Sequence, residues 1–186
     1  MCNSWSLLAS NQTVESQLYQ LVITMKLLRP IQQSRRLLAI ISLLISTSLW
    51  ATDFDTIIAQ KEAPEGVVIE IVSDEDGLLS DLLPEIRQQI IRLRERFPDL
   101  PVAIVTHGRE QFDLTTKNRK VESIAHKITE QLVTDEEVDV HVCGTHAGWY
   151  GVEPEDFPEY VDVSTTGPAQ VNDYESMGYE LIVLPD

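Results

Sequence analysis

The chain has 186 residues, of which 14 are basic and 30 acidic, and its formal net charge at pH 7 is −16. Such an acidic protein repels nucleic acid phosphates and the head groups of anionic membranes, which argues against both as partners. Cys2 and Cys143 are the only cysteines.

Residues 25–51 have the layout of a secretory signal peptide. Four basic residues form its positive start: Lys26, Arg29, Arg35 and Arg36. An uncharged core follows at 37–49, and Ala51 offers a small residue for cleavage. The core is short for a membrane-spanning helix, which needs about 20 residues, although a single-pass anchor is the alternative. Residues 1–24 fit neither a signal nor a domain, and we expect them to be an upstream over-extension, with Met25 as the true start.

Cleavage after Ala51 would leave residues 52–186, enough for one domain with a two- or three-layer core. It would remove four of the 14 basic residues and one of the 30 acidic ones, so the mature charge would be −19. We expect a soluble periplasmic protein with no membrane contact after cleavage. Cys143 would then be the only thiol, so no intramolecular disulfide could form. The thiol should be buried, joined to another chain, or used.

The pattern of the mature chain alternates between strand and helix periods after a polar lead at 52–66. Short apolar runs predict five strands, at 67–73, 102–107, 138–143, 161–165 and 180–184. Helical spacing predicts helices at 78–97, 121–132 and 168–177, with a short one within 148–157. Because Pro84 is tolerated only in a first turn, we expect the first helix to begin near Asp81. The stretch 108–118 reads as a loop.

This alternation, with no hairpin signals between strands, predicts one α/β domain over residues 67–186. We expect a five-stranded, mostly parallel sheet with helices on both faces, in three layers. Ligands of such sheets gather at the carboxyl ends of the strands. Cys143 ends the third predicted strand and His107 ends the second.

The residues after Cys143 suit a reactive thiol. Gly144 allows a tight turn, and we expect a short helix to start within the next few residues, where free N–H groups stabilise a thiolate. His146 or His107, if protonated, would add to this effect. The alternative is an inert buried thiol at the end of a strand, because buried cysteines are common.

The order of elements resembles the DsrE/TusD-like sulfur-relay proteins (DsrE/DsrF-like, with a YchN-type fold). The matching segments are Cys143-Gly144 at a strand end, Gly151-Val152 through Glu155-Asp156, the strand at 161–164, and Gly178-Tyr179 before the last strand. VVIEIVS and AIVTHG look like the first and second strands of the family, and the resemblance covers roughly residues 66–185.

The resemblance implies a compact five-stranded α/β fold that assembles as trimers or hexamers. It also implies a cysteine that carries sulfane sulfur as a persulfide, which by position is Cys143. Two features depart from the family. Its relay members are cytoplasmic whereas this chain has export signals, and Trp149 and Tyr150 give the segment after the cysteine a bulky aromatic character.

Our first hypothesis is therefore sulfur carriage without a cofactor. The Cys143 thiolate would attack a sulfane sulfur, hold it as a persulfide and pass it to the thiol of a partner protein. His146 and His107 would tune the thiolate, the N–H groups of Gly144 and Thr145 would steady the anion, and Trp149 would contact the substrate. The segment GTHAGW lacks the arginine of an anion-binding rhodanese loop, which favours a sulfurtransferase-like carrier over a stand-alone enzyme.

Two other classes of function compete with this one. His141 and Cys143 share a strand face, so with His146 and His107 they could form a nitrogen and sulfur site for zinc or copper. A non-catalytic oligomeric binding module, with a pocket lined by Trp149 and Tyr150, is the third hypothesis.

Overall fold

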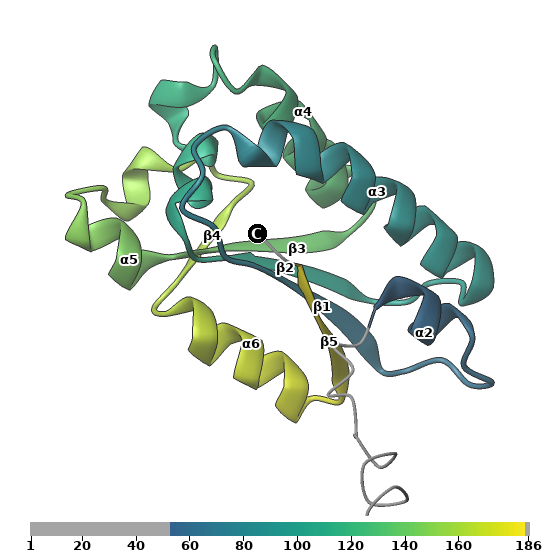
Figure 1. The fold of residues 1–186 in the computed structure, drawn as a ribbon. Helices are drawn as coiled ribbons and strands as arrows, with labels where there is room; N and C mark the ends of the chain where they lie inside the picture. Colours follow the sequence, from purple (N-terminus) through teal and green to yellow (C-terminus); the bar gives the residue numbers. More distant parts are fainter. Residues whose placement is uncertain (1–52, 185–186) are drawn as a thin grey trace, which may run out of the picture. The chain divides into compact units, whose positions relative to one another are not determined.

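The structure is a computed structural model that describes residues 53–184, and it consists of a parallel β-sheet with helices on both faces (Figure 1). The strands are β1 (Gly66–Ile71), β2 (Val102–Thr106), β3 (Val138–Cys143), β4 (Asp162–Ser164) and β5 (Tyr179–Leu184). The α-helices are α2 (Phe54–Ile58), α3 (Leu78–Arg96), α4 (Ser123–Thr134), α5 (Gly144–Trp149) and α6 (Gly167–Ser176). Three short 3₁₀ helices complete the set: η1 (Arg109–Leu114), η2 (Thr116–Asn118) and η3 (Pro154–Asp156).

The predictions for residues 1–52, including the over-extension, the signal peptide and its cleavage site, lie outside the described residues. Within residues 53–184, no helix is long and apolar enough to cross a membrane.

The sheet has the strand order β4-β3-β2-β1-β5, and every neighbouring pair is parallel. The predicted α/β class with a five-stranded sheet is confirmed. The chain adds β2, β3 and β4 on one side of β1 and then crosses back to place β5 on its other side. Because such crossovers are right-handed, a connection that runs in the opposite direction places its helix on the opposite face. Accordingly, α3 and α4 cover one face and α6 the other (Figure 1).

Alternating strand residues form two apolar cores. The larger core packs inward-facing residues such as Val67 and Ile69 of β1 against α3 and α4. The smaller one packs Val68, on the other face of β1, against Val171 and Tyr174 of α6. The sheet is thus buried on both faces, as near-continuous apolar strands require.

The helix α3 begins at Leu78, not near Asp81 as predicted, and contains Pro84 in its interior. The reason lies outside the helix, in the buried side chain of Asp113. Its two carboxylate oxygens accept hydrogen bonds from the N–H groups of Gly77 and Leu79, at 2.9 and 3.1 Å. These bonds satisfy free donors at the helix start and favour the additional turn.

Two segments contain structure that the sequence patterns did not indicate. The polar lead at 52–66 includes α2, whose Ile57 is fully buried. The predicted loop at 108–118 contains η1 and η2, and several polar side chains of η1 are buried. This second difference matters for function, because η1 lies behind the carboxyl edge of the sheet.

Candidate functional site

A pocket of about 480 Å³ lies at the carboxyl edge of the sheet, where β1, β2 and β3 end beside the start of α6. Its lining consists of Val72, Asp74, His107, Gly108, Cys143, Thr145, His146, Trp149, Thr166 and Pro168. Five of the six predicted site residues therefore line one pocket. The sixth, Gly144, is not in the lining but directly follows Cys143. This is the edge at which open parallel sheets bind ligands.

Cys143 is the last residue of β3 and the N-cap of α5, and only 4% of its surface is exposed. Its Sγ accepts a hydrogen bond from the N–H of His146 at 3.3 Å. The N–H of Thr145, which was predicted to steady the anion, instead donates to the carbonyl of Thr165 at 3.1 Å. The sulfur thus has a fixed N–H donor, supplied by a different residue from those predicted.

Gly144 supports the turn after Cys143 by a close approach to β4. A Cβ atom at this position would lie 3.0 Å from the carbonyl oxygen of Ser164 and 3.2 Å from Cγ1 of Val163. The glycine therefore lets α5 start directly at the sheet edge, as the predicted tight turn requires.

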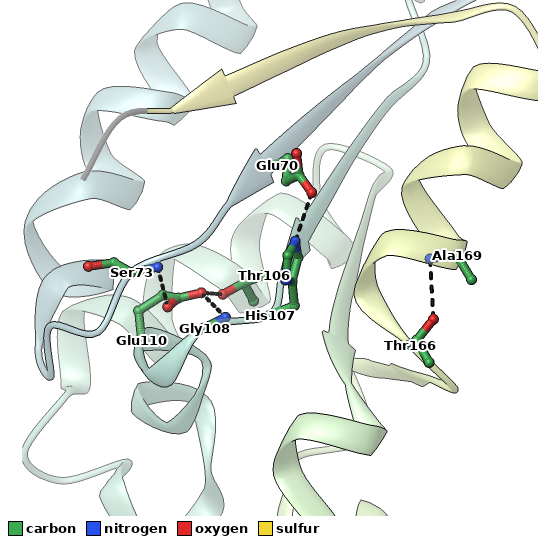
Figure 2. Close-up of polar contacts among 8 residues, drawn as sticks. All are labelled: Glu70, Ser73, Thr106, His107, Gly108, Glu110, Thr166 and Ala169. Carbon is green, nitrogen blue, oxygen red and sulfur yellow. Dashed lines mark hydrogen bonds and ion pairs between the residues drawn. The ribbon is translucent and has the colours of Figure 1, made fainter.

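His107 follows β2 and is oriented by a carboxylate from the neighbouring strand (Figure 2). Its Nε2 lies 2.8 Å from Oε1 of Glu70 on β1, and both side chains are mostly buried. Since an ionised carboxylate only accepts, Nε2 carries a proton and Nδ1 is the ring nitrogen left free of this pair. Glu70 was not among the predicted site residues, although it is the lone acidic residue in the apolar run VVIEIVS.

The first residue of α6 holds His107 from the other side. A Cβ atom on Gly167 would lie only 2.4 Å from Cβ of His107, so the backbone of α6 packs directly on this side chain. Thr166 begins the helix by accepting a hydrogen bond on Oγ1 from the N–H of Ala169 at 3.2 Å (Figure 2). The capped start of α6 thus fixes one wall of the pocket.

Gln111 of η1 links Cys143 to His146, and its side chain is completely buried. Its Oε1 accepts a hydrogen bond from the backbone N–H of Cys143 at 2.8 Å, and its Nε2 lies 3.0 Å from Nδ1 of His146. A backbone N–H can only donate, so the amide orientation is fixed and Nε2 must donate to the imidazole. His146 therefore holds its lone pair on Nδ1 and its proton on Nε2.

This arrangement favours a different role for His146 from the predicted one. A protonated ring would direct an Nδ1–H group at the amide NH₂ of Gln111, which offers no acceptor. His146 thus acts in the pocket as a neutral hydrogen-bond donor, not as a cation beside the thiolate. No pattern in the sequence indicated Gln111, because the partners are 32 and 35 residues away.

Glu110, the neighbour of Gln111, ties the loops behind the pocket together and is also completely buried (Figure 2). Its carboxylate accepts hydrogen bonds from the N–H of Ser73 at 2.8 Å, the N–H of Gly108 at 2.9 Å and the hydroxyl of Thr106. These bonds join the ends of β1 and β2, so Glu110 positions the two loops between which His107 emerges.

His141 does not reach the pocket. Its Nε2 lies 2.8 Å from the hydroxyl oxygen of Tyr174 on α6, and that hydroxyl donates to Asp139 at 3.2 Å. Burial lowers the pKa of His141 and raises that of Tyr174, so the trio packs as a neutral imidazole and phenol beside one carboxylate. Among residues 53–184, no group of three or more His, Cys, Asp or Glu side chains is placed to hold a metal ion. The set His141, Cys143 and His146 is therefore not brought together.

The two aromatic residues after Cys143 serve different cavities. Trp149 lines the Cys143 pocket and is 76% exposed, whereas Tyr150 lines a neighbouring cavity with Phe112 and Arg109. The ring of His146 lies between them, 5.6 Å from Trp149 and 5.2 Å from Tyr150 by centroid. The two aromatics predicted to share one pocket thus line two different cavities, and His146 lines the one with Trp149.

Comparisons with known proteins concern the fold. No protein-family model and no curated protein sequence matches the chain. The solved structure of MTH1491 from Methanobacterium thermoautotrophicum, a protein of unknown function, is 19% identical, with a TM-score of 0.50 over 63% of this chain and 97% of that one. The ychN protein of E. coli is 13% identical, with a TM-score of 0.47 over 64% of this chain and 99% of that one. The chain therefore shares the α/β fold of MTH1491.

Proposed function

We propose that the protein is a sulfur carrier that holds sulfane sulfur as a persulfide on Cys143 and passes it to a partner thiol. The observation that carries the proposal is the pocket itself. It brings a free cysteine, two histidines with fixed hydrogen-bond partners and an exposed tryptophan to the carboxyl edge of the sheet. The resemblance to DsrE/TusD-like proteins supports the same reading through the position of Cys143.

The loading step uses groups that line the pocket. Cys143–SH and a persulfide donor R–S–SH give Cys143–S–SH and R–SH. The Cys143 sulfur attacks the terminal sulfur of the donor, the donor S–S bond breaks, and R–S⁻ leaves with the electron pair and takes up a proton. Nδ1 of His107 is the nitrogen suited to relay the thiol proton, because Glu70 already accepts from Nε2.

Two N–H groups would steady the sulfur anion that forms. The backbone N–H of His146 already contacts Sγ, and the Nε2–H of the same residue is the free donor of its ring. Transfer to the partner repeats the exchange in reverse, with the partner thiolate attacking the outer sulfur of the persulfide.

The test is the intact mass of the full chain after brief exposure to polysulfide or a persulfide donor. Cys2→Ser serves as the background, so that Cys143 is the only thiol. We expect a gain of one sulfur atom, reversed by dithiothreitol and absent from the Cys2→Ser, Cys143→Ser protein. A protein that gains no sulfur, although a neutral alkylating reagent modifies Cys143, would refute sulfur carriage.

The exposure of Trp149 favours a second candidate, a binding module without catalysis. In this case Cys143→Ser would keep the full cellular role, whereas Trp149→Ala would lose it. The phenotype of Cys143→Ser therefore separates the two candidates, because sulfur carriage requires this thiol and a binding module does not.

The proposal also includes the setting expected from the sequence. An exported protein with residues 25–51 removed would meet its sulfur donor and acceptor in the periplasm, as a homo-oligomer of three or six chains. N-terminal sequencing of the protein from a periplasmic fraction, and its mass in solution, test these two parts separately.

A further inference from the structure

The fixed charge in the lining of the Cys143 pocket is negative. Among the described residues that line the pocket none is lysine or arginine, and the exposed Asp74 is an acid. Behind His107 lies a second carboxylate, that of Glu70, at 2.8 Å. Arg109, which follows the pocket residue Gly108, faces the neighbouring cavity, where it pairs with Asp76 at 3.0 Å.

The hydrogen bond from Gln111 removes one further source of positive charge, the ring of His146. Gln111 donates to its Nδ1, which leaves the ring neutral, with one N–H as its contribution. An anionic sulfur donor such as thiosulfate would therefore enter a pocket with a carboxylate at its rim and with no lysine or arginine in its lining to replace its hydration. The net charge of −16 for the whole chain acts in the same direction.

Apolar side chains that are open to solvent contribute to the rest of the lining. Val72 is 38% exposed and Trp149 is 76% exposed, and both line the pocket together with Pro168. Large exposed apolar side chains around a reactive group suit an apolar or aromatic substituent, which loses water on binding. The tryptophan ring adds a flat surface for stacking.

We propose that the pocket admits an uncharged sulfur donor with an apolar or aromatic substituent and discriminates against small anionic donors. The chemical class is an organic polysulfane, R–S–S–S–R. Cys143 attacks the central sulfur, one bond from that sulfur to R–S breaks, and R–S⁻ leaves and takes the Cys143 proton, which gives Cys143–S–S–S–R and R–SH. A second thiol, R′–SH, then attacks the outer sulfur and leaves Cys143–S–SH and R–S–S–R′. The role of this donor in the cell rests on the proposed sulfur carriage, whereas the selectivity of the pocket does not.

The selectivity is measured with three thiol reagents of matched reactivity on the full-length Cys2→Ser protein: benzyl, 2-sulfonatoethyl and 2-trimethylammonioethyl methanethiosulfonate. Each forms Cys143–S–S–R and releases methanesulfinate, and each rate is divided by the rate with N-acetylcysteine amide. We expect the neutral benzyl reagent to react about tenfold faster than the anionic one after this correction.

Two variants assign the selectivity to the pocket. Asp74→Asn should reduce the ratio to about threefold, whereas Glu95→Gln, an equal change of charge on an exposed residue of α3, should leave it unchanged. Trp149→Ala should slow the benzyl reagent alone, by about threefold.

Three results would overturn the proposal: an anionic reagent that reacts as fast as the neutral one, equal effects of Asp74→Asn and Glu95→Gln, or failure of all three reagents to reach Cys143. The sulfur-mass test separates the two proposals. The expected selectivity without any persulfide would refute carriage and keep the pocket chemistry. Persulfide formed by thiosulfate as readily as by dibenzyl trisulfide would refute the selectivity and keep carriage.

Discussion

Replacement of Gln111 tests whether this side chain sets the hydrogen-bonding state of the site. Gln111→Glu keeps an oxygen for the N–H of Cys143 but places a second oxygen opposite Nδ1 of His146, where the amide now donates. An oxygen there requires a proton on Nδ1. The substitution should therefore move the ring proton from Nε2 to Nδ1, or add a second one, without any change in side-chain size.

Gln111→Met tests how much the two hydrogen bonds of Gln111 contribute to the free energy of unfolding. It keeps the approximate length and the burial of the side chain but leaves the N–H of Cys143 and Nδ1 of His146 without their partner. An unsatisfied buried donor costs about 1–3 kcal/mol, and the half-buried ring adds less, so we expect a loss of about 2–4 kcal/mol in the free energy of unfolding. Gln111→Glu keeps one of the two bonds but places a carboxylate at a fully buried position, so its loss should be at least as large as that of Gln111→Met.

The assay for the ring is long-range ¹H–¹⁵N correlation NMR at about pH 8, where an ordinary histidine is neutral. In the wild-type protein the ¹⁵N shifts of His146 should report an unprotonated Nδ1 and a protonated Nε2. In Gln111→Glu, Nδ1 should be protonated. Urea denaturation of the three proteins supplies the energies. A wild-type His146 protonated on Nδ1, or the same ring state in both proteins, would show that Gln111 does not set the state of the ring.

Three further predictions concern stability and the walls of the site. The hydroxyl of Thr129 is buried without a hydrogen-bond partner in the described part of the chain, so Thr129→Val should stabilise by about 1 kcal/mol in urea denaturation, and Thr129→Ala should not. Burial raises the pKa of Asp113 to about 6, so the folded protein holds this proton while the unfolded chain has released it. The contribution of this group to the free energy of unfolding is fully present below about pH 4, and up to about 3 kcal/mol should be lost as the pH rises through 6. Asp113→Asn should lack this trend, and parallel pH profiles of the two proteins would contradict the prediction. Gly167→Ala should cost about 1–3 kcal/mol in the free energy of unfolding and displace His107. Gly148→Ala should be neutral or slightly stabilising, because no neighbouring segment lies within 4 Å of its Cβ. Equal stabilities of the two variants would show that α6 can shift to accommodate the added methyl group.

The secondary-structure elements could be predicted from local sequence pattern. Alternation of apolar runs with helical spacing predicted the five strands and the parallel sheet. Because parallel strands all present their carboxyl ends at one edge, the same pattern was enough to place Cys143 and His107 together. That reasoning needs only the ends of the strands, and these were predicted to within one or two residues.

The side chains that complete the site, and the hydrogen-bonding state of each, depend on tertiary packing. Glu70 meets His107 because β1 and β2 are neighbours in a fixed register, which no local pattern reveals. Gln111 forms hydrogen bonds with Cys143 and His146 from a segment that was predicted to be a loop. A hydrogen bond with Tyr174 holds His141 outside the pocket. Hydrogen bonds between residues distant in sequence depend on how the elements pack. They therefore fix the tautomer of His146 and the start of α3, which composition and periodicity leave open.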